Sequence, residues 1–110
     1  MNSTQVKFAN VRKLAALISK DTWEAIKAEN KEWSENEYDH FARISFKIGG
    51  KKVFDHIVTI TMGTENESHL SVEWLKISKR KCSGRKYGFN GRVKIEELDS
   101  TMRQIMESAF

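Results

Sequence analysis

Apolar residues recur at helical spacing near the N-terminus of the chain. The residues that follow the i, i+3, i+4, i+7 rule are Val11, Leu14, Ala15, Leu17 and Ile18. They predict an amphipathic helix that begins after an N-cap at Asn10. Asp21 and Glu24 resemble a capping box, so either a second helix starts there or the first one bends. The segment 29–39 is too polar to pack on all sides, and we expect the helical part to end near Glu32 and a surface loop to follow.

The period of the apolar pattern changes to two after this loop, which is typical of strands with one buried face. We predict one strand at 41–48 and a second at 53–62, joined across a Gly-Gly pair that marks a hairpin. A three-residue turn that ends at Lys51 pairs Phe46 with Phe54 and keeps the strongest apolar sets on one face. We therefore expect this register.

The second half of the chain continues the alternating pattern and then returns to helical spacing. A third strand is predicted at 69–78, where the apolar parity switches between Trp74 and Leu75. Such a switch indicates either a β-bulge or a strand that is covered on both faces. The glycine-rich segment 83–91 predicts a turn or hairpin, and 92–95 predicts a short final strand. The apolar face of a last helix consists of Ile95, Leu98, Met102, Ile105, Met106 and Ala109.

These patterns predict an α+β fold in a single domain over residues 1–110: an N-terminal helix or helix pair, a four-stranded antiparallel meander, and a C-terminal helix packed on the sheet. A chain of 110 residues with 39% hydrophobic residues fits one core of ordinary size. The longest apolar runs fall far short of the roughly 18 residues that a membrane-spanning helix needs. Residues 1–5 lack the pattern of a secretory leader, and the single cysteine, Cys82, cannot form an internal disulfide. We therefore expect a cytoplasmic protein that makes no membrane contact.

Positive charge is concentrated in one part of the chain. The formal net charge is only +4, yet residues 76–94 contain eight basic residues and no acidic one. Clustered cations attract phosphates through the release of counterions, and aromatic rings stack on unpaired bases. The candidate residues for binding single-stranded or structured nucleic acid are Lys76, Lys79, Arg80, Lys81, Arg85, Lys86, Tyr87, Phe89, Arg92 and Lys94.

Further basic residues near the N-terminus extend this hypothesis. Lys7, Arg12, Lys13 and Lys20 lie outside the apolar stripe of the first helix, so we expect them to assist the 76–94 segment. A helix-turn-helix interpretation of residues 11–33 is disfavoured, because the would-be recognition helix carries several acids that phosphates would repel.

The acidic stretch 29–39 supports an alternative function. Trp33, Glu35 and Glu37 form a candidate partner-binding set, since tryptophan is enriched in interface hot spots. We expect Trp33 to pack against the sheet, but an exposed Trp33 would be an anchor for a partner. In this alternative the protein is a small inhibitor or regulator of the kind that phages and other mobile elements encode. It would dock onto a host protein or nucleoprotein complex that handles nucleic acid.

The sequence contains no recognisable catalytic or metal-binding signature. His40, His56, His69 and Cys82 lack the paired spacing of zinc ligands, and no Cys-His or phosphate-loop motif occurs. We expect His56 to be a histidine at the edge of the core. The sequence thus predicts a protein that is not an enzyme and that holds no cofactor.

Overall fold

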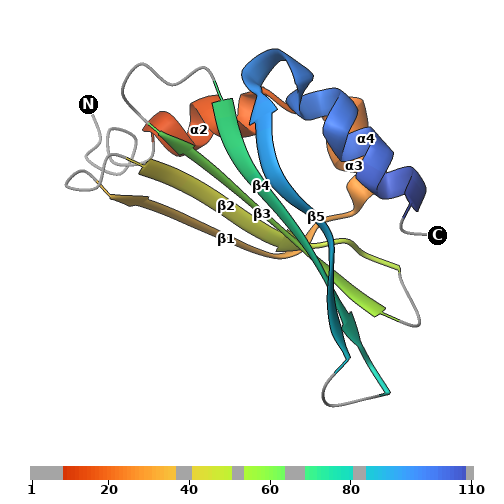
Figure 1. Cartoon of the computed structure of the whole chain (residues 1–110). Helices are drawn as coiled ribbons and strands as arrows, with labels where there is room; N and C mark the ends of the chain where they lie inside the picture. The colour runs from red at the N-terminus through yellow and green to blue at the C-terminus, as the bar shows by residue number, and fades with distance from the viewer. Residues whose placement is uncertain (1–8, 37–40, 51–53, 64–68, 81–83, 109–110) are drawn as a thin grey trace.

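The computed structural model describes residues 9–36, 41–50, 54–63, 69–80 and 84–108. Along the chain the elements are α2 (Ala9–Ala16), α3 (Lys20–Ile26), β1 (Glu29–Asn36), β2 (Phe41–Lys47), β3 (Phe54–Gly63), β4 (His69–Ser78), β5 (Arg85–Lys94), the 3₁₀ turn η1 (Ile95–Glu97) and α4 (Leu98–Ser108). Within these residues, five antiparallel strands form one sheet in the order β1-β2-β3-β4-β5 (Figure 1). The α+β class is therefore confirmed.

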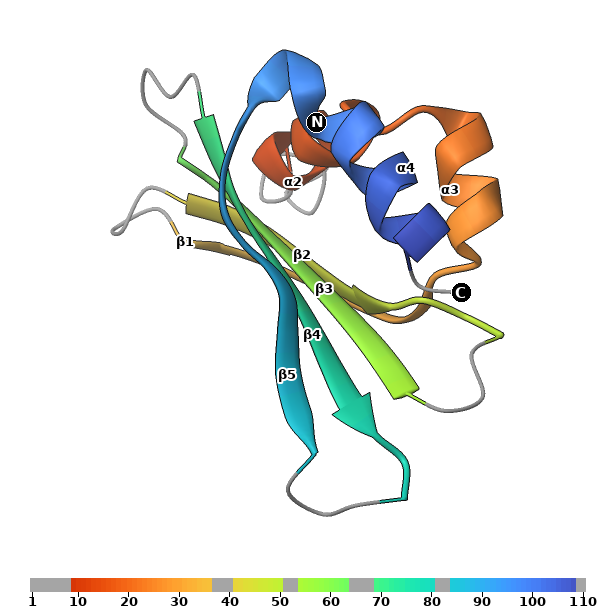
Figure 2. The ribbon, with the colours of Figure 1, turned by 45° about the vertical axis from the view of Figure 1, so that its right-hand side comes forward.

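The helices α2, α3 and α4 all lie against the same face of the sheet, as the two views in Figures 1 and 2 show. We call this face the inner face and the opposite, uncovered one the outer face. The core lies between the helices and the inner face, and its most buried side chains include Leu14, Ile44, Phe46, Ile60 and Leu98. Burial alternates along β2 and β3 with the period of two that the sequence predicts. Among the described residues, none of the helices is long and apolar enough to cross a membrane.

The two N-terminal helices are separate, but their boundaries differ from the prediction. The second helix begins after Ser19, whose hydroxyl accepts a hydrogen bond from the backbone N–H of Thr22 at 3.3 Å. The expected cap at Asp21 is therefore wrong by two residues. The expected N-cap at Asn10 is also wrong, because α2 already begins at Ala9. The N-terminal end of α2 is capped from another element instead: a carboxylate oxygen of Glu35 accepts from the backbone N–H groups of Asn10 and Val11. A carboxylate suits this position, where the N–H groups of a helix are unpaired.

The polar segment after α3 is a strand, not the expected loop. β1 pairs with β2 so that Trp33 faces Ile44 and Ser34 faces Arg43. Trp33 is the only apolar residue in this strand, so β1 carries almost no alternation that a sequence pattern would detect. An edge strand can form in this way because backbone hydrogen bonds to one neighbour hold it. The meander therefore has five described strands instead of four.

The register between β2 and β3 also differs from the prediction. Phe46 pairs with Val58, not with Phe54, although both registers place the same residues on the core face. Ile48 donates to the backbone carbonyl of His56, which is incompatible with the expected three-residue turn, and Gly49 donates to the end of α3 at Ile26. The beginning of β3 pairs instead with β4, where Phe54 lies opposite Ser78.

The predicted bulge lies at Trp74 and Leu75. The fifth strand is longer than expected, since β5 already begins at Arg85 within the segment predicted as a turn. The final helix is matched in part: Leu98, Met102 and Ile105 are buried on the apolar face of α4, whereas Ile95 belongs to η1 and Ala109 lies outside the described residues.

Candidate nucleic-acid interface

The outer face of the sheet is organised in rows, because the strand register aligns side chains across all the described strands. The arginine row contains Ser34, Arg43, Thr61, Ser71 and Arg92. The glutamate row beside it contains Glu32, Ser45, Thr59, Glu73 and Asn90. The next row contains Lys47 followed by the apolar or aromatic side chains of Ile57, Leu75 and Tyr87.

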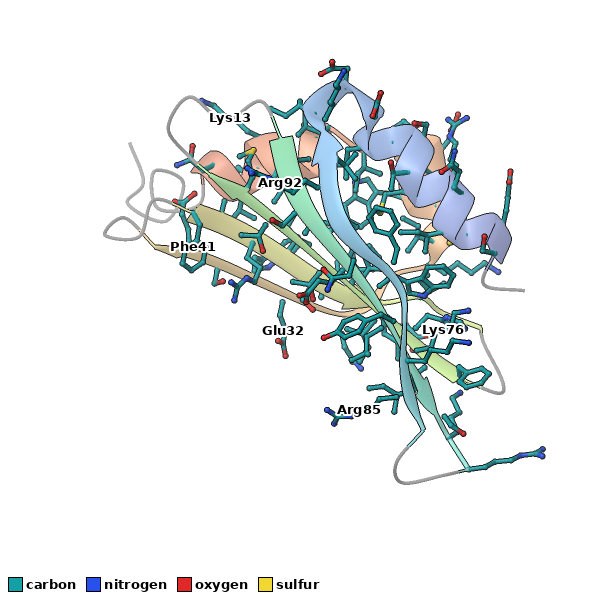
Figure 3. The ribbon with its side chains drawn as sticks, viewed as in Figure 1. Lys13, Glu32, Phe41, Lys76, Arg85 and Arg92 are labelled. Carbon is teal, nitrogen blue, oxygen red and sulfur yellow. The ribbon has the colours of Figure 1, made fainter. Side chains whose placement is uncertain are left out.

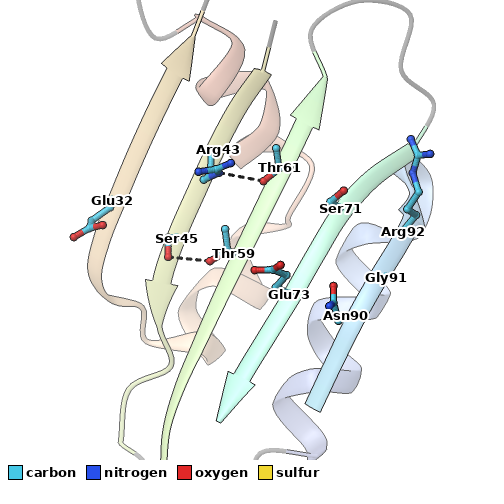
Figure 4. A pocket seen from close by; sticks show the side chains of 10 residues that line it. All are labelled: Glu32, Arg43, Ser45, Thr59, Thr61, Ser71, Glu73, Asn90, Gly91 and Arg92. Carbon is cyan, nitrogen blue, oxygen red and sulfur yellow. Dashed lines mark hydrogen bonds between the residues drawn. The ribbon is translucent and has the colours of Figure 1, made fainter. Parts of the chain in front are cut away.

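A shallow polar hollow of about 570 Å³ lies over the arginine and glutamate rows (Figure 4). Its floor is formed by the short side chains of Ser45, Thr59, Thr61 and Ser71. Ser45 and Thr59 share a hydrogen bond of 3.2 Å across the strands, and Nε of the longer Arg43 donates to Thr61 at 3.3 Å. Longer side chains surround this floor. They are Glu32, Arg43, Glu73, Asn90 and Arg92.

The outer side of β5 brings several polar and aromatic residues into one line, which we call the β5 surface. Its members, all exposed, are Arg85, Tyr87, Asn90, Arg92 and Lys94. Tyr87 is 55% exposed, so its ring is available for stacking. At about 3.4 Å per residue this line extends over roughly 30 Å. No acidic residue occurs in β5, and cations therefore dominate its outer side.

The structure distributes the other candidates of the 76–94 segment over different places. Lys76 and Lys86 face each other across the strands on the inner side, and the Lys76 ammonium lies 4.6 Å from the centre of the Trp74 ring. Lys79 forms an ion pair of 3.7 Å with Asp55. The remaining residues lie elsewhere: Arg80 beyond the end of β4, Phe89 against the core, and Lys81 outside the described residues. In Figure 3, Lys76 and Arg85 lie at the end of the sheet that is remote from α2.

The N-terminal basic residues lie in the helical layer. Arg12 and Lys13 belong to α2 and Lys20 to α3, which cover the inner face (Figure 3). The sheet separates them from the β5 surface, so they do not extend it. Lys7 lies outside the described residues.

Trp33 is exposed, contrary to the expectation that it packs against the sheet. It lies opposite the buried Ile44 on the inner face, yet its side chain remains 48% exposed. Trp33 lines a hollow of about 380 Å³ together with Val11, Arg12 and Ala15. Of the other partner-binding candidates, Glu35 is engaged at the end of α2, and Glu37 lies outside the described residues.

His56 is buried beneath the helices and beside Trp74. It is 4% exposed, and its Nδ1 accepts a hydrogen bond of 3.1 Å from the indole N–H of Trp74. In the part of the chain that the structure describes, no three His, Cys, Asp or Glu side chains are close enough together to hold a metal ion. His40 and Cys82 lie outside that part.

Asn90, Glu73 and Arg43 were not among the residues that the sequence indicated. Asn90 lies within the 76–94 segment, whereas Glu73 and Arg43 join the same outer face only through strand pairing. Parity along β4 places Glu73 on the outer face, but its neighbours across the sheet depend on the register. No protein-family model, curated protein or solved structure matches the chain. The interpretation of this surface therefore rests on its own residues.

Proposed function

We propose that the protein binds single-stranded nucleic acid along the β5 surface. The observation that carries this proposal is the line of exposed cations and one exposed aromatic ring on a strand without acids. Arg85, Arg92 and Lys94 contact phosphates, which release counterions on binding. Tyr87 stacks on a base, an interaction worth about 1–3 kcal/mol.

A single strand fits this surface better than a duplex. Sequence in duplex DNA is contacted mainly by a helix or a two-stranded ribbon inserted into the major groove. The cations of the β5 surface instead lie on the open side of a sheet, over which unpaired bases can spread and stack.

The proposal is tested by charge reversal on the two sides of the sheet. The double variant Arg85→Glu and Arg92→Glu changes the net charge from +4 to 0, since each reversal removes two charges. We expect it to weaken binding to a labelled oligonucleotide by more than about tenfold at low salt. The slope of log K against log salt should fall by about 1.4, or roughly 0.7 for each lost phosphate contact on a single strand.

The matched control is the double variant Lys13→Glu and Lys20→Glu, which makes the same change of net charge in the helical layer. It should retain the wild-type salt slope and an affinity within about threefold of the wild type. Equal losses in both double variants, or no binding by the wild type at low salt, would refute the proposal.

A second candidate function is suggested by the exposed indole of Trp33. The hollow between α2 and β1 is lined mainly by apolar atoms and is open to solvent. It suits a protein partner that inserts an apolar side chain beside Trp33. In a nuclease-treated pull-down, Trp33→Ala should then lose a partner that the wild type retains, while oligonucleotide binding is unchanged. A partner retained equally by both proteins would exclude this site.

A further inference from the structure

Glu73 and Asn90 form a cross-strand pair on the outer face, near the β5 edge of the sheet. They lie directly opposite each other in β4 and β5, at the side of the polar hollow next to the β5 surface (Figure 4). Both side chains are exposed, and within the described part of the chain neither makes a hydrogen bond or an ion pair. A carboxylate beside a phosphate-binding surface opposes binding by electrostatic repulsion. The position of Glu73 is therefore explained by a contact with a part of the nucleic acid other than its phosphates.

From this geometry we infer that Glu73 and Asn90 select guanine in the bound strand, an inference that rests on the proposed function. The Watson–Crick edge of guanine presents one acceptor, O6, followed by two donors, N1–H and the N2 amino group. The two carboxylate oxygens of Glu73 accept from both donors, and the side-chain amide of Asn90 donates to O6. All three groups of the base are thereby paired.

The other bases match this pair less well. Thymine and uracil present an acceptor on both sides of a single N–H, so one carboxylate oxygen would face a lone pair. Cytosine presents two acceptors beside its amino group, with the same result. Adenine offers one donor and one acceptor, which leaves one carboxylate oxygen without a partner. Guanine alone satisfies both oxygens of Glu73.

The position of the pair suits a base as well. Opposite residues of antiparallel strands have Cβ atoms about 5 Å apart, close enough for both side chains to contact one base edge. The hollow beside them, at about 570 Å³, lies within the range of pockets that hold small organic ligands. Tyr87 lies one row away, where it stacks on the neighbouring base while guanine occupies the hollow.

The experiment measures the binding of short oligothymidines that carry guanine, adenine, cytosine or thymine at one central position. The same series is made as RNA on an oligouridine background, and a single guanine per strand keeps the probes unstructured. We expect the guanine strand to bind the wild type about tenfold more tightly than the others in at least one backbone, the discrimination typical of a bidentate base contact.

Two isosteric variants separate hydrogen bonding from charge. Glu73→Gln replaces one acceptor by a donor, so the guanine preference should fall to about twofold or less, while binding of the uniform strand stays equal or becomes tighter. Glu24→Gln removes the same charge from an exposed position on α3, in the helical layer away from the hollow, and should retain the preference. If the wild type binds all strands equally in both backbones, or if Glu73→Gln keeps the preference, the inference is wrong and the proposed function stands. Failure of the wild type to bind any strand would refute both.

Discussion

Gly88 allows β5 to pass over the Trp74 side chain. A Cβ atom at this position would lie 2.5 Å from Cε3 of the Trp74 ring, closer than two carbon atoms can approach. Trp74 is itself fixed, since it is buried and its indole N–H donates to His56. Because neither the Trp74 ring nor the backbone of β5 has room to move, this close approach requires a glycine.

Gly88→Ala should destabilise the protein by about 1–3 kcal/mol, the usual cost of overpacking a core. Chemical denaturation monitored by tryptophan fluorescence would measure the loss. Gly91→Ala is the matched control in the same strand, because its Cβ would meet only the Phe89 ring at 3.6 Å, an ordinary contact. We expect a change of about 0.5 kcal/mol or less there. Similar losses in the two variants would contradict the packing argument.

Gly88 also explains why the sequence did not show which of Tyr87 and Phe89 faces outward, where a base could stack on it. Tyr87 and Phe89 are two positions apart, so an unbroken strand would place both on one face. The parity switch at Trp74 and Leu75 correctly indicates a bulge, but it does not locate the extra residue in the partner strand. Because Gly88 is that residue, Tyr87 faces outward and Phe89 packs against the core.

At the scale of elements, Asp99 connects α4 to the beginning of α3. One of its carboxylate oxygens accepts a hydrogen bond of 2.7 Å from the backbone N–H of Ser19, and the other lies 3.1 Å from Nε of Arg103. The hydrogen bond from Ser19 is the main reason that the pKa of Asp99 lies below its usual value of 3.8, with smaller contributions from Thr22 and Arg103. The same Arg103 nitrogen also donates to the hydroxyl of Thr22.

The lowered pKa of Asp99 predicts how stability depends on pH. A carboxyl group whose pKa is lower in the folded state stabilises the fold fully above its unfolded pKa, here the usual 3.8, and this contribution is lost as the pH falls through the folded value. Asp99→Asn should therefore cost about 1 kcal/mol at neutral pH, discounted for partial exposure. Unfolding free energies measured from pH 7 to about 2.5 should show this difference shrinking below about pH 4. A difference that is constant over the whole range would contradict the assignment.

The elements were predictable in proportion to their contact with the core. α4 and the strands β2 to β4 each place several apolar residues against it, so their periodicity is visible in the sequence. β1 and most of β5 are edge strands held mainly by backbone hydrogen bonds. Because backbone hydrogen bonds do not depend on side-chain type, these strands have no clear apolar alternation in the sequence. The segment 29–39, predicted to end in a loop, contains β1, and the segment 83–91, predicted as a turn, contains most of β5. These two strands form the edges of the sheet.

At the scale of the whole molecule, the sheet divides the basic segment into two populations. Arg85 and Tyr87 lie on the outer face, whereas Lys86, between them in the sequence, lies on the inner face opposite Lys76. A count of charges along the chain cannot distinguish these populations, because neighbouring residues of a strand point to opposite faces. The density of cations was therefore visible in the sequence, but its division between the faces was not.

Arg85→Glu and Lys86→Glu make the same change of charge one residue apart, and we expect opposite consequences. Lys86→Glu converts a like-charged cross-strand pair with Lys76 into an attractive one, so it should stabilise the fold by about 0.2–1 kcal/mol. It should leave oligonucleotide affinity within about threefold of the wild type, because its side chain lies on the face away from the β5 surface. Arg85→Glu should leave stability nearly unchanged and weaken binding by about tenfold. Denaturation and fluorescence anisotropy at low salt measure the two effects. Equal losses of affinity would mean that the strand contacts the whole edge of β5, inner side included, and not its outer side alone.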